Sequence, residues 1–377
     1  MSAVIAGYFR SPFTPAHRGK LAGVRSDDIA AAVINALVKE TKIDPSLIED
    51  LIVGTAFPEA EQGFNMARMI TFLTNLPESV AGVTINRFCG SSMQAIHDAV
   101  GRIAMGSGSA FIAGGVESMT RIPMTGFNPM PNPKLSENYP EAFTSMGITA
   151  ENLAKKYSIN REMQEEFAIQ SQSRASISRD SGLFSEEIVA IETKEESINS
   201  DGCIRPGTDS DALSKLNPAF DSKGTVTAGT SSPLTDGAAF VLVCSEEFAN
   251  ENKLTPLARI LSTAVSGCSP EMMGIGPVEA TKKALKRANI SLDEIGIIEL
   301  NEAFAAQSLA VIEELGLDIS KVNIEGGAIA LGHPLGASGA RITGKAAQLL
   351  RKKGEKYALA TMCIGGGQGI ATVLERI

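Results

Sequence analysis

Buried strands are the clearest feature of the hydrophobic pattern of this chain. Near-continuous apolar runs of this kind are typical of strands covered on both faces. Segments with helical periodicity lie between them, and the alternation predicts an α/β fold with helices on both sides of each sheet. The strand runs are LIVGTA (51–56), AFIAGG (110–115), FVLVCS (240–245) and ALATMC (358–363), and the helical segments include 27–40 and 277–288.

A repeat connects the two ends of the chain. Residues 36–56 and 284–303 share an amphipathic helix, a polar turn, a short acidic turn and an apolar strand. Residues 84–115 and 328–367 share a Gly-rich turn, a small-residue helix, a linker and an apolar strand that ends in glycines. Two related halves are the simplest explanation, and equivalent turns of such halves are expected to face one shared cleft.

Residues 117–238 interrupt the repeat. They begin with a Pro- and Asn-rich loop, continue through a helical stretch over 148–182 that has polar turn residues after Tyr157, and end in further loop. We interpret them as an inserted loop domain that carries ligand contacts. The predicted N-terminal half is then 1–116 plus 239–253, and the C-terminal half is 254–377.

Composition narrows the class of function. Apolar residues make up 44% and charged residues 20% of 377 residues, the balance of an ordinary globular protein. The net charge of −9 argues against nucleic acid as a partner. No apolar run approaches the length of a membrane span, and the N-terminus lacks the pattern of a secretory signal. Five scattered cysteines without metal-site spacing predict free thiols and a cytoplasmic location.

Only three histidines are candidates for acid–base chemistry. His97 is eight helical residues from Cys89, a rise of about 12 Å that rules out a direct hydrogen bond, and His17 lies in a polar loop; both are interpreted as structural. His333 lies among five glycines in GGAIALGHPLGASGAR, in the turn that the repeat pairs with Cys89. Such a segment brings backbone close to a ligand and holds one imidazole in place.

Two cysteines and one asparagine occupy comparable positions. Cys89 in INRFCGSSMQA stands where a helix begins, and the helix dipole and a nearby histidine are expected to stabilise its thiolate. Cys363 in CIGGGQG follows an apolar strand, and Asn301 in NEAFA follows another. A reactive thiol, a histidine and a second thiol fit covalent acyl transfer. The alternatives are a core cysteine for Cys363 and a helix N-cap for Asn301. GGGQG and GSGSAF fit neither nucleotide-binding pattern.

The ordered motifs INRFCGSSMQA, GGVESM, MGIGP, NEAFA, GGAIALGHPLGASGAR and CIGGGQG resemble those of the thiolases over essentially the whole chain. The resemblance implies a duplicated five-layer αβαβα core, with a mixed sheet in each half and an inserted loop domain that covers coenzyme A. It also implies acyltransferase activity: cleavage of 3-ketoacyl-CoA by CoA, or the reverse Claisen condensation of two acetyl-CoA.

The resemblance assigns five catalytic positions. Cys89 is the nucleophile that becomes acylated in a ping-pong mechanism, and Cys363 is the second cysteine, which exchanges protons with the substrate α-carbon and the incoming thiol. His333 activates the nucleophile and, with a water held by Asn301, forms an oxyanion hole for the thioester enolate. The N–H groups of Cys89 and Gly365 form the second oxyanion hole, for the tetrahedral acyl intermediate.

Ligand contacts are implied in the same way. Arg205 and Ser232 correspond to residues that contact CoA, and Phe220, Met146 and Phe304 are assigned to the same site. The expected ligands are CoA and acyl-CoA as substrates, with no metal and no prosthetic group. Thiolases form dimers that often pair into tetramers, and the apolar segment 119–133 is a candidate for the second contact.

Two residues differ from those found at the same positions in many members of the family. Ser92 stands where many members have Gly, and Glu325 where many biosynthetic members have Asn. The forms INRFC, GGVESM and TSSPLTDGAA are closer to degradative 3-ketoacyl-CoA thiolases, which act in fatty acid β-oxidation. Chain-length preference depends on the pocket under residues 117–150, whose shape the sequence does not give.

Three other functions compete with this interpretation. A ketoacyl synthase uses one cysteine with two histidines or His and Asn, so Cys363 argues against it. A cysteine hydrolase also uses Cys, His and Asn, but it needs neither a second thiol nor a repeat. A non-catalytic acyl-CoA-binding protein on the same fold would not need to retain Cys89, His333, Asn301 and Cys363 together.

Overall fold

One large mixed sheet runs through the molecule. The computed structural model describes residues 2–377. The sheet order is β4–β3–β5–β8–β1–β9–β12–β11–β10, with β2 beside β8, and β6 and β7 form a separate hairpin. The strands are β1 (Ala3–Arg10), β2 (Thr14–Pro15), β3 (Asp50–Gly54), β4 (Ala81–Ile85), β5 (Ala110–Ser118), β6 (Ile191–Glu192), β7 (Ser197–Ile198), β8 (Thr235–Ser245), β9 (Ala258–Gly267), β10 (Ile295–Leu300), β11 (Tyr357–Ile364) and β12 (Gln368–Glu375).

The predicted repeat is confirmed by this strand order. Read outward from the middle, one half runs β1, β8, β5, β3, β4 and the other runs β9, β12, β11, β10, so the connectivity is the same. Val322 pairs with Ile298 at the place that β4 takes in the first half. The two sheets expected for the two halves are not separate, because β1 and β9 pair antiparallel with Val4 opposite Arg259. Hydrogen bonding between these edge strands joins the halves.

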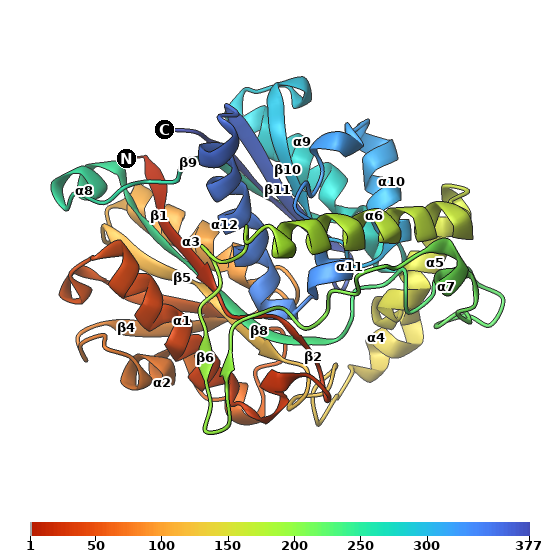
Figure 1. Ribbon diagram of the computed structural model, residues 1–377, viewed down its shortest axis with the longest axis horizontal. Helices are drawn as coiled ribbons and strands as arrows, with labels where there is room; N and C mark the ends of the chain where they lie inside the picture. The colour runs from red at the N-terminus through yellow and green to blue at the C-terminus, as the bar shows by residue number, and fades with distance from the viewer. Residues whose placement is uncertain (1) are drawn as a thin grey trace.

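Helices cover the sheet in layers (Figure 1). The central layer is α3 (Ser91–Met105) and α12 (Leu335–Lys353), which pack on each other and on strands of both halves. The outer layers are α1 (Ser26–Thr41) with α2 (Met66–Leu73), and α9 (Gly276–Ala288) with α10 (Ala305–Leu315). Three apolar clusters fill the spaces between these layers, so the five-layered α/β architecture is confirmed.

The central helices approach closely because small residues face each other. A Cβ atom added to Gly339 of α12 would lie 2.5 Å from the backbone nitrogen of Met93 in α3. Only glycine allows this approach. The helices that follow the Cys89 and His333 turns are therefore held side by side, which positions the two turns relative to each other.

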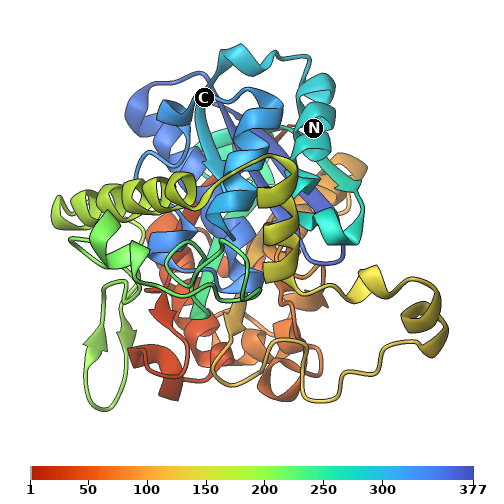
Figure 2. The ribbon, with the colours of Figure 1, turned by 90° about the vertical axis from the view of Figure 1, so that its right-hand side faces the viewer.

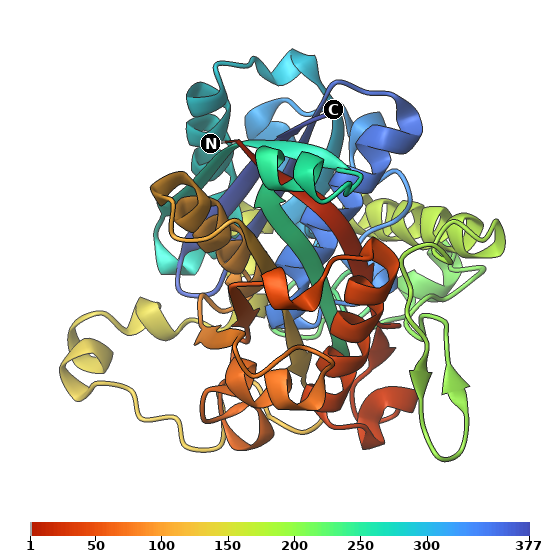
Figure 3. The same cartoon turned by 90° about the vertical axis from the view of Figure 1, so that its left-hand side faces the viewer.

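Residues between β5 and β8 form the inserted segment. The helix–turn–helix predicted for 148–182 is confirmed as α5 (Met146–Lys156) and α6 (Arg161–Asp180). Figures 2 and 3 both show the stretch before α5 projecting from the body. β8 begins at Thr235, four residues before the predicted boundary, and the domain division remains a prediction. The remaining helices are α4 (Pro133–Asn138), α5 (Met146–Lys156), α6 (Arg161–Asp180), α7 (Ser210–Ser214), α8 (Glu246–Glu251) and α11 (Ala328–Leu331).

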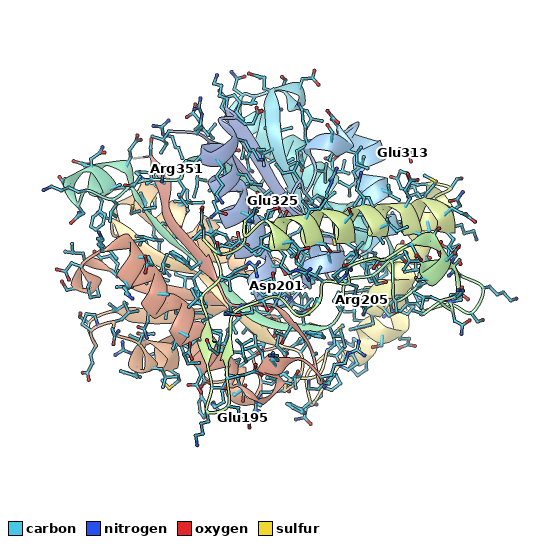
Figure 4. All side chains as sticks on the ribbon, viewed as in Figure 1. Glu195, Asp201, Arg205, Glu313, Glu325 and Arg351 are labelled. Carbon is cyan, nitrogen blue, oxygen red and sulfur yellow. The ribbon has the colours of Figure 1, made fainter. Side chains whose placement is uncertain are left out.

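Charged residues are buried where the insertion meets both halves. Arg10 of β1 binds Glu187 at 2.7 Å and Asp201 at 2.7 Å, and Lys345 of α12 pairs with Glu187 and Glu325. Figure 4 places Asp201 on the loop below α6 and Glu325 beside the same helix. Each of these carboxylates has a cationic partner, as buried charges require. No helix within residues 2–377 combines the length and apolar character of a membrane span.

Candidate active site

Cys89 lies on a strained turn between β4 and α3. The preceding residue, Phe88, has a left-handed φ of 43°, which a side chain other than glycine adopts at a cost. Its N–H donates to Oδ1 of Asn86 at 2.7 Å, which holds the turn. The N–H groups of Gly90 and Ser91 are already bonded to the carbonyls of Arg87 and Phe88 at 3.0 Å each. The amides of Gly90 and Ser91 therefore do not point at the thiol.

The expectation of a resting thiolate at Cys89 is wrong. Burial raises the pKa of Cys89 to about 12, although N–H groups of Gly365 and of Cys89 itself hydrogen-bond the sulfur and lower that pKa. Nearby Glu117 raises the pKa further. Because the amides of Gly90 and Ser91 are bonded elsewhere, desolvation outweighs the stabilising groups. Cys89 is thus a neutral thiol at rest, and its proton has to be removed as it reacts.

His333 is held by three contacts on a glycine turn. Gly332 has a φ of 103°, and a Cβ atom there would lie 2.7 Å from Thr235, so glycine is required. The His333 N–H donates to Oγ1 of Thr235 at 3.0 Å. The ring lies between Ser338, 2.5 Å from Nδ1 to Oγ, and Asn301, 3.3 Å from Nε2 to Nδ2. These contacts fix both the position and the plane of the imidazole.

The surroundings of His333 keep it neutral. Burial lowers the pKa of His333 to about 3, and the positive charge of Arg341 contributes. The Ser338 hydroxyl donates to the carbonyl of Pro334 at 3.1 Å, so its single proton is not available to Nδ1. Nδ1 must then carry the hydrogen, which leaves the lone pair on Nε2. His333 is thereby prepared to accept a proton.

Cys363 and Gly365 lie at the hairpin between β11 and β12. Burial raises the pKa of the Cys363 thiol well above its usual range, and the nearby Cys89 adds to this effect. Gly365 begins the turn, and Gly366 and Gly367 each have a φ of 78°. The hairpin therefore carries a second neutral thiol and the N–H that reaches the Cys89 sulfur.

One cavity of about 720 Å³ joins these groups. Cys89, His333 and Cys363 line it, which confirms that the equivalent turns face a shared cleft. All five residues assigned to CoA also line it: Met146, Arg205, Phe220, Ser232 and Phe304. Asn301 and Gly365 are not part of the lining, but they contact His333 and Cys89 respectively. The rings of Phe220 and Phe304 meet edge to face at 5.7 Å between centroids.

Sequence reasoning missed part of this cavity. His17 and Arg18 lie at its wall, as does Arg205, which Figure 4 labels on the loop that follows Asp201. Arg18 and Arg205 also line an adjoining chamber of about 400 Å³. Among the described residues no acidic side chain lines either space, although the protein is acidic overall. The adjacent residues His17 and Arg18 were visible in the sequence, but no spacing related them to Cys89.

Three residues left without a catalytic role find structural partners. His97 contacts Oγ1 of Thr372 at 2.9 Å, as its structural interpretation requires. The Ser92 hydroxyl accepts the N–H of Ala340 at 2.8 Å and so links α3 to α12. Glu325 accepts from Nζ of Lys345 at 2.9 Å. Among the described residues no cluster of three or more His, Cys, Asp or Glu has the arrangement of a metal site.

The comparison with protein families decides the identity of the group. The family model of the thiolase N-terminal domain matches residues 3–247, and that of the thiolase C-terminal domain matches residues 254–376. The chain belongs to the thiolase family. It is therefore an acyltransferase, and the thiolase assignment excludes the ketoacyl synthase and cysteine hydrolase alternatives.

Individual thiolases are similar over their whole length. The chain is 49% identical to the 3-ketoacyl-CoA thiolase of Marinobacter nauticus, covering 99% of this chain and 98% of the relative. It is 46% identical to that of Bacillus subtilis, covering 99% of each. Human mitochondrial 3-ketoacyl-CoA thiolase in complex with CoA superposes with a TM-score of 0.92 at 39% identity, covering 100% of this chain and 98% of that structure.

Proposed function

We propose that this thiolase cleaves 3-ketoacyl-CoA with CoA to give acetyl-CoA and an acyl-CoA shortened by two carbons. The same site would catalyse the reverse condensation of two acetyl-CoA molecules. The observation that carries the proposal is the single cavity in which Cys89, His333 and Cys363 meet the residues assigned to CoA. Two thiols beside one imidazole supply a nucleophile, a base and a carbon acid in one place.

The first half-reaction transfers the acyl group to Cys89. Nε2 of His333 takes the thiol proton while the sulfur attacks the C3 carbonyl of the substrate. The N–H groups of Cys89 and Gly365, which already bond the sulfur, stabilise the oxyanion at C3. The C2–C3 bond then breaks, Cys363 donates its proton to C2, and acetyl-CoA leaves an acylated Cys89 and a Cys363 thiolate.

The enolate of acetyl-CoA needs its own stabilisation during this step. The protonated Nε2 of His333 is one donor, and a water held by Asn301 is the other. Oδ1 of Asn301 is buried and has no hydrogen-bond partner among the described residues, which supports a water at this position. Both donors lie on the His333 side of the cavity, so the two oxyanions of the reaction have separate sites.

The second half-reaction returns the acyl group to CoA. The Cys363 thiolate takes the proton of the incoming CoA thiol, whose sulfur attacks the Cys89 thioester. The tetrahedral intermediate collapses, acyl-CoA leaves, and the Cys89 sulfur recovers its proton from His333. Each group returns to its starting state, as a ping-pong cycle requires.

The cavity supports CoA as the ligand. Its lining is largely apolar around Met146, Phe220 and Phe304, which suits the pantetheine arm. Arg205 lies at the wall with no acidic side chain beside it in the lining, which suits a phosphate. Ser232 donates to the carbonyl of Ala303 at 3.1 Å and lines the same wall.

We further propose a homodimer that acts in the cytoplasm in fatty acid β-oxidation. β4 is an edge strand that pairs only with β3 in the sheet order, so its outer edge is open to a second copy. Large apolar side chains are exposed around it: Phe64, Met69, Phe72, Leu73 and Phe88. Exposed Phe127 and Met130 in the projecting segment support the second contact predicted for 119–133 in a tetramer.

Thiolysis assays across chain lengths test the catalytic proposal. Purified protein is mixed with CoA and 3-ketoacyl-CoA substrates from four carbons upward, and ketoacyl-CoA loss and acetyl-CoA formation are followed. Wild type should consume the substrates, and Cys89→Ala should abolish both turnover and acyl labelling. Absence of CoA-dependent substrate loss at every chain length would refute the proposal. Light scattering coupled to size-exclusion chromatography measures the molar mass of the protein in solution and so tests the proposed dimer.

A further inference from the structure

Two side chains connect the turn that carries Cys89 to the turn that carries Gly365. Arg87 precedes Cys89 by two residues, and Gln368 begins β12 after the glycine turn. Neither residue lines the catalytic cavity, and neither takes part in the mechanism above. Both are half-buried, and the contact between them joins the two halves of the fold.

The contacts form a continuous chain. Nε of Arg87 donates to Oε1 of Gln94 at 2.8 Å, which orients the guanidinium from the first turns of α3. Nη1 of Arg87 donates to Oε1 of Gln368 at 2.9 Å. Nε2 of Gln368 then donates to the carbonyl of Gly365 at 3.4 Å. The N–H of the same Gly365 hydrogen-bonds the sulfur of Cys89.

Arg87 fixes the orientation of the Gln368 side-chain amide in this series of hydrogen bonds. A guanidinium has only donors, so the atom of Gln368 that faces Arg87 has to be the carbonyl oxygen. The amide nitrogen of Gln368 is thereby turned to the Gly365 carbonyl. Without the arginine, the side-chain amide could present either end to Gly365, and the oxygen would repel the carbonyl.

Gly365 needs such support because it has no side chain to hold it. It is followed by two glycines with left-handed φ, so the turn has few conformational restraints of its own. A bond to its carbonyl restricts rotation about the Gly365 backbone and so limits the directions its N–H can take. An oxyanion-hole donor is effective only when it points to where the charge develops.

We propose that Arg87 and Gln368 are positioning residues that aim the Gly365 N–H at the Cys89 sulfur and at the oxyanion of the acyl intermediate. Arg87 acts through Gln368, and Gln368 acts through the Gly365 carbonyl. The inference deepens the proposed function, since it concerns the same oxyanion hole. It predicts that both residues affect the chemical step and leave CoA binding unchanged.

The variants Arg87→Ala and Gln368→Ala, alone and together, test the chain, with Arg102→Ala as the control. Arg102 lies on α3, the helix that follows Arg87, and forms an ion pair with Asp50, away from the glycine turn. Two readouts are needed: kcat and KM for thiolysis, and the rate of Cys89 alkylation by iodoacetamide between pH 6 and pH 10. Alkylation requires no CoA substrate, so it reports on the turn even if no ketoacyl-CoA is cleaved.

Each single variant should lower kcat about tenfold to a hundredfold with KM within about twofold, because one oxyanion donor is misdirected rather than removed. Alkylation at a fixed pH should slow about tenfold, equivalent to a rise of one unit in the pKa of Cys89. The double variant should lose no more than the larger single loss, because both residues act through one bond.

Arg87→Ala and Gln368→Ala with wild-type kcat and alkylation rates would overturn the inference. So would losses that multiply in the double variant, or an equal loss in Arg102→Ala. Gln368→Ala changes no charge, so a slower alkylation in that variant cannot come from the electrostatic effect of an arginine. If wild type alkylates normally but cleaves no ketoacyl-CoA, the proposed function fails while the positioning chain is still measured.

Discussion

Ser338→Ala is a direct test of how His333 is prepared as a base. The hydroxyl of Ser338 is 2.5 Å from Nδ1 of the imidazole and donates its proton to the carbonyl of Pro334. It therefore acts as the acceptor for Nδ1–H and keeps the lone pair on Nε2. Alanine removes that acceptor. Because His333 is only 4% exposed, solvent has little access to replace the hydroxyl as the partner of Nδ1–H.

The size of the effect follows from the cost of an unpaired buried donor. Leaving the Nδ1–H without a partner costs about 1–3 kcal/mol. That cost grows when Nε2 gains a proton, because the imidazolium then carries a full charge in a site that already lowers the pKa of His333 to about 3. If the penalty is felt only in the transition state, kcat falls roughly 5-fold to 150-fold, and KM changes little.

The assay separates this role from a structural one. Steady-state thiolysis gives kcat and KM, and rapid mixing with acetyl-CoA gives the rate of acyl-enzyme formation. Nitrogen-15 NMR of histidine-labelled protein identifies the protonated ring nitrogen, and the chain has only three histidines to assign. Ser92→Ala is the matched control, since Ser92 is equally buried and also contacts α12 but not the imidazole.

Two outcomes would refute the reasoning. The first is a Ser338→Ala variant with kcat within about twofold of wild type. The second is a wild-type spectrum that shows the hydrogen on Nε2, because Ser338 would then be a donor and not an acceptor. A loss of activity shared equally by Ser92→Ala would assign the effect to helix packing.

Three further predictions follow from charge. Burial raises the pKa of Glu299 to about 7, so the folded state keeps a proton that the unfolded chain loses near pH 4.5. The free energy of unfolding should therefore fall by up to about 3 kcal/mol between pH 4.5 and 7. In urea unfolding experiments, the free energy of unfolding of Glu299→Gln should depend less on pH over this range. Arg18 lines the cavity, so Arg18→Ala should raise KM for acetoacetyl-CoA several-fold and weaken the dependence of this KM on salt concentration. KM for acetoacetyl-pantetheine should stay unchanged. Lys20→Ala should alter none of these values. Lys345→Met should lower the free energy of unfolding by about 3–5 kcal/mol by leaving Glu325 unpaired, and Lys345→Met with Glu325→Met should recover part of it in the same urea assay.

Much of the fold was accessible from the sequence because strands buried on both faces leave unbroken apolar runs. The runs at 110–115, 240–245 and 358–363 all lie within observed strands. The helices predicted for 27–40 and 277–288 differ from α1 and α9 by one residue at most at each end. The edge-to-edge pairing of β1 and β9 was missed, since nothing in a strand's own sequence says which neighbour its edge will meet.

The electrostatic state of Cys89 was the main error, and its cause is local geometry. A cysteine near a helix start predicts a stabilised thiolate only if helix amides are free to face it. Here a left-handed Phe88 turns the chain so that the amides of Gly90 and Ser91 bond carbonyls behind them. The φ angle of Phe88 therefore determines where these amides point. A left-handed φ cannot be predicted from a phenylalanine in the sequence, because this residue rarely adopts that conformation.

Ser92 and Glu325 show that a duplicated sequence predicts the location of a site more readily than it predicts the structural role of an individual residue. The repeat pairs turns that are far apart, so it could bring Cys89 and His333 to one cleft without any knowledge of contacts. Ser92 has its partner at Ala340, in the other half of the chain, and Glu325 has its partner at Lys345, in the middle of α12. Both residues stabilise α12, the helix that carries His333 at its N-terminal turn, so both affect the site through packing. Contacts of this kind depend on how the halves dock, and that docking is visible only in three dimensions.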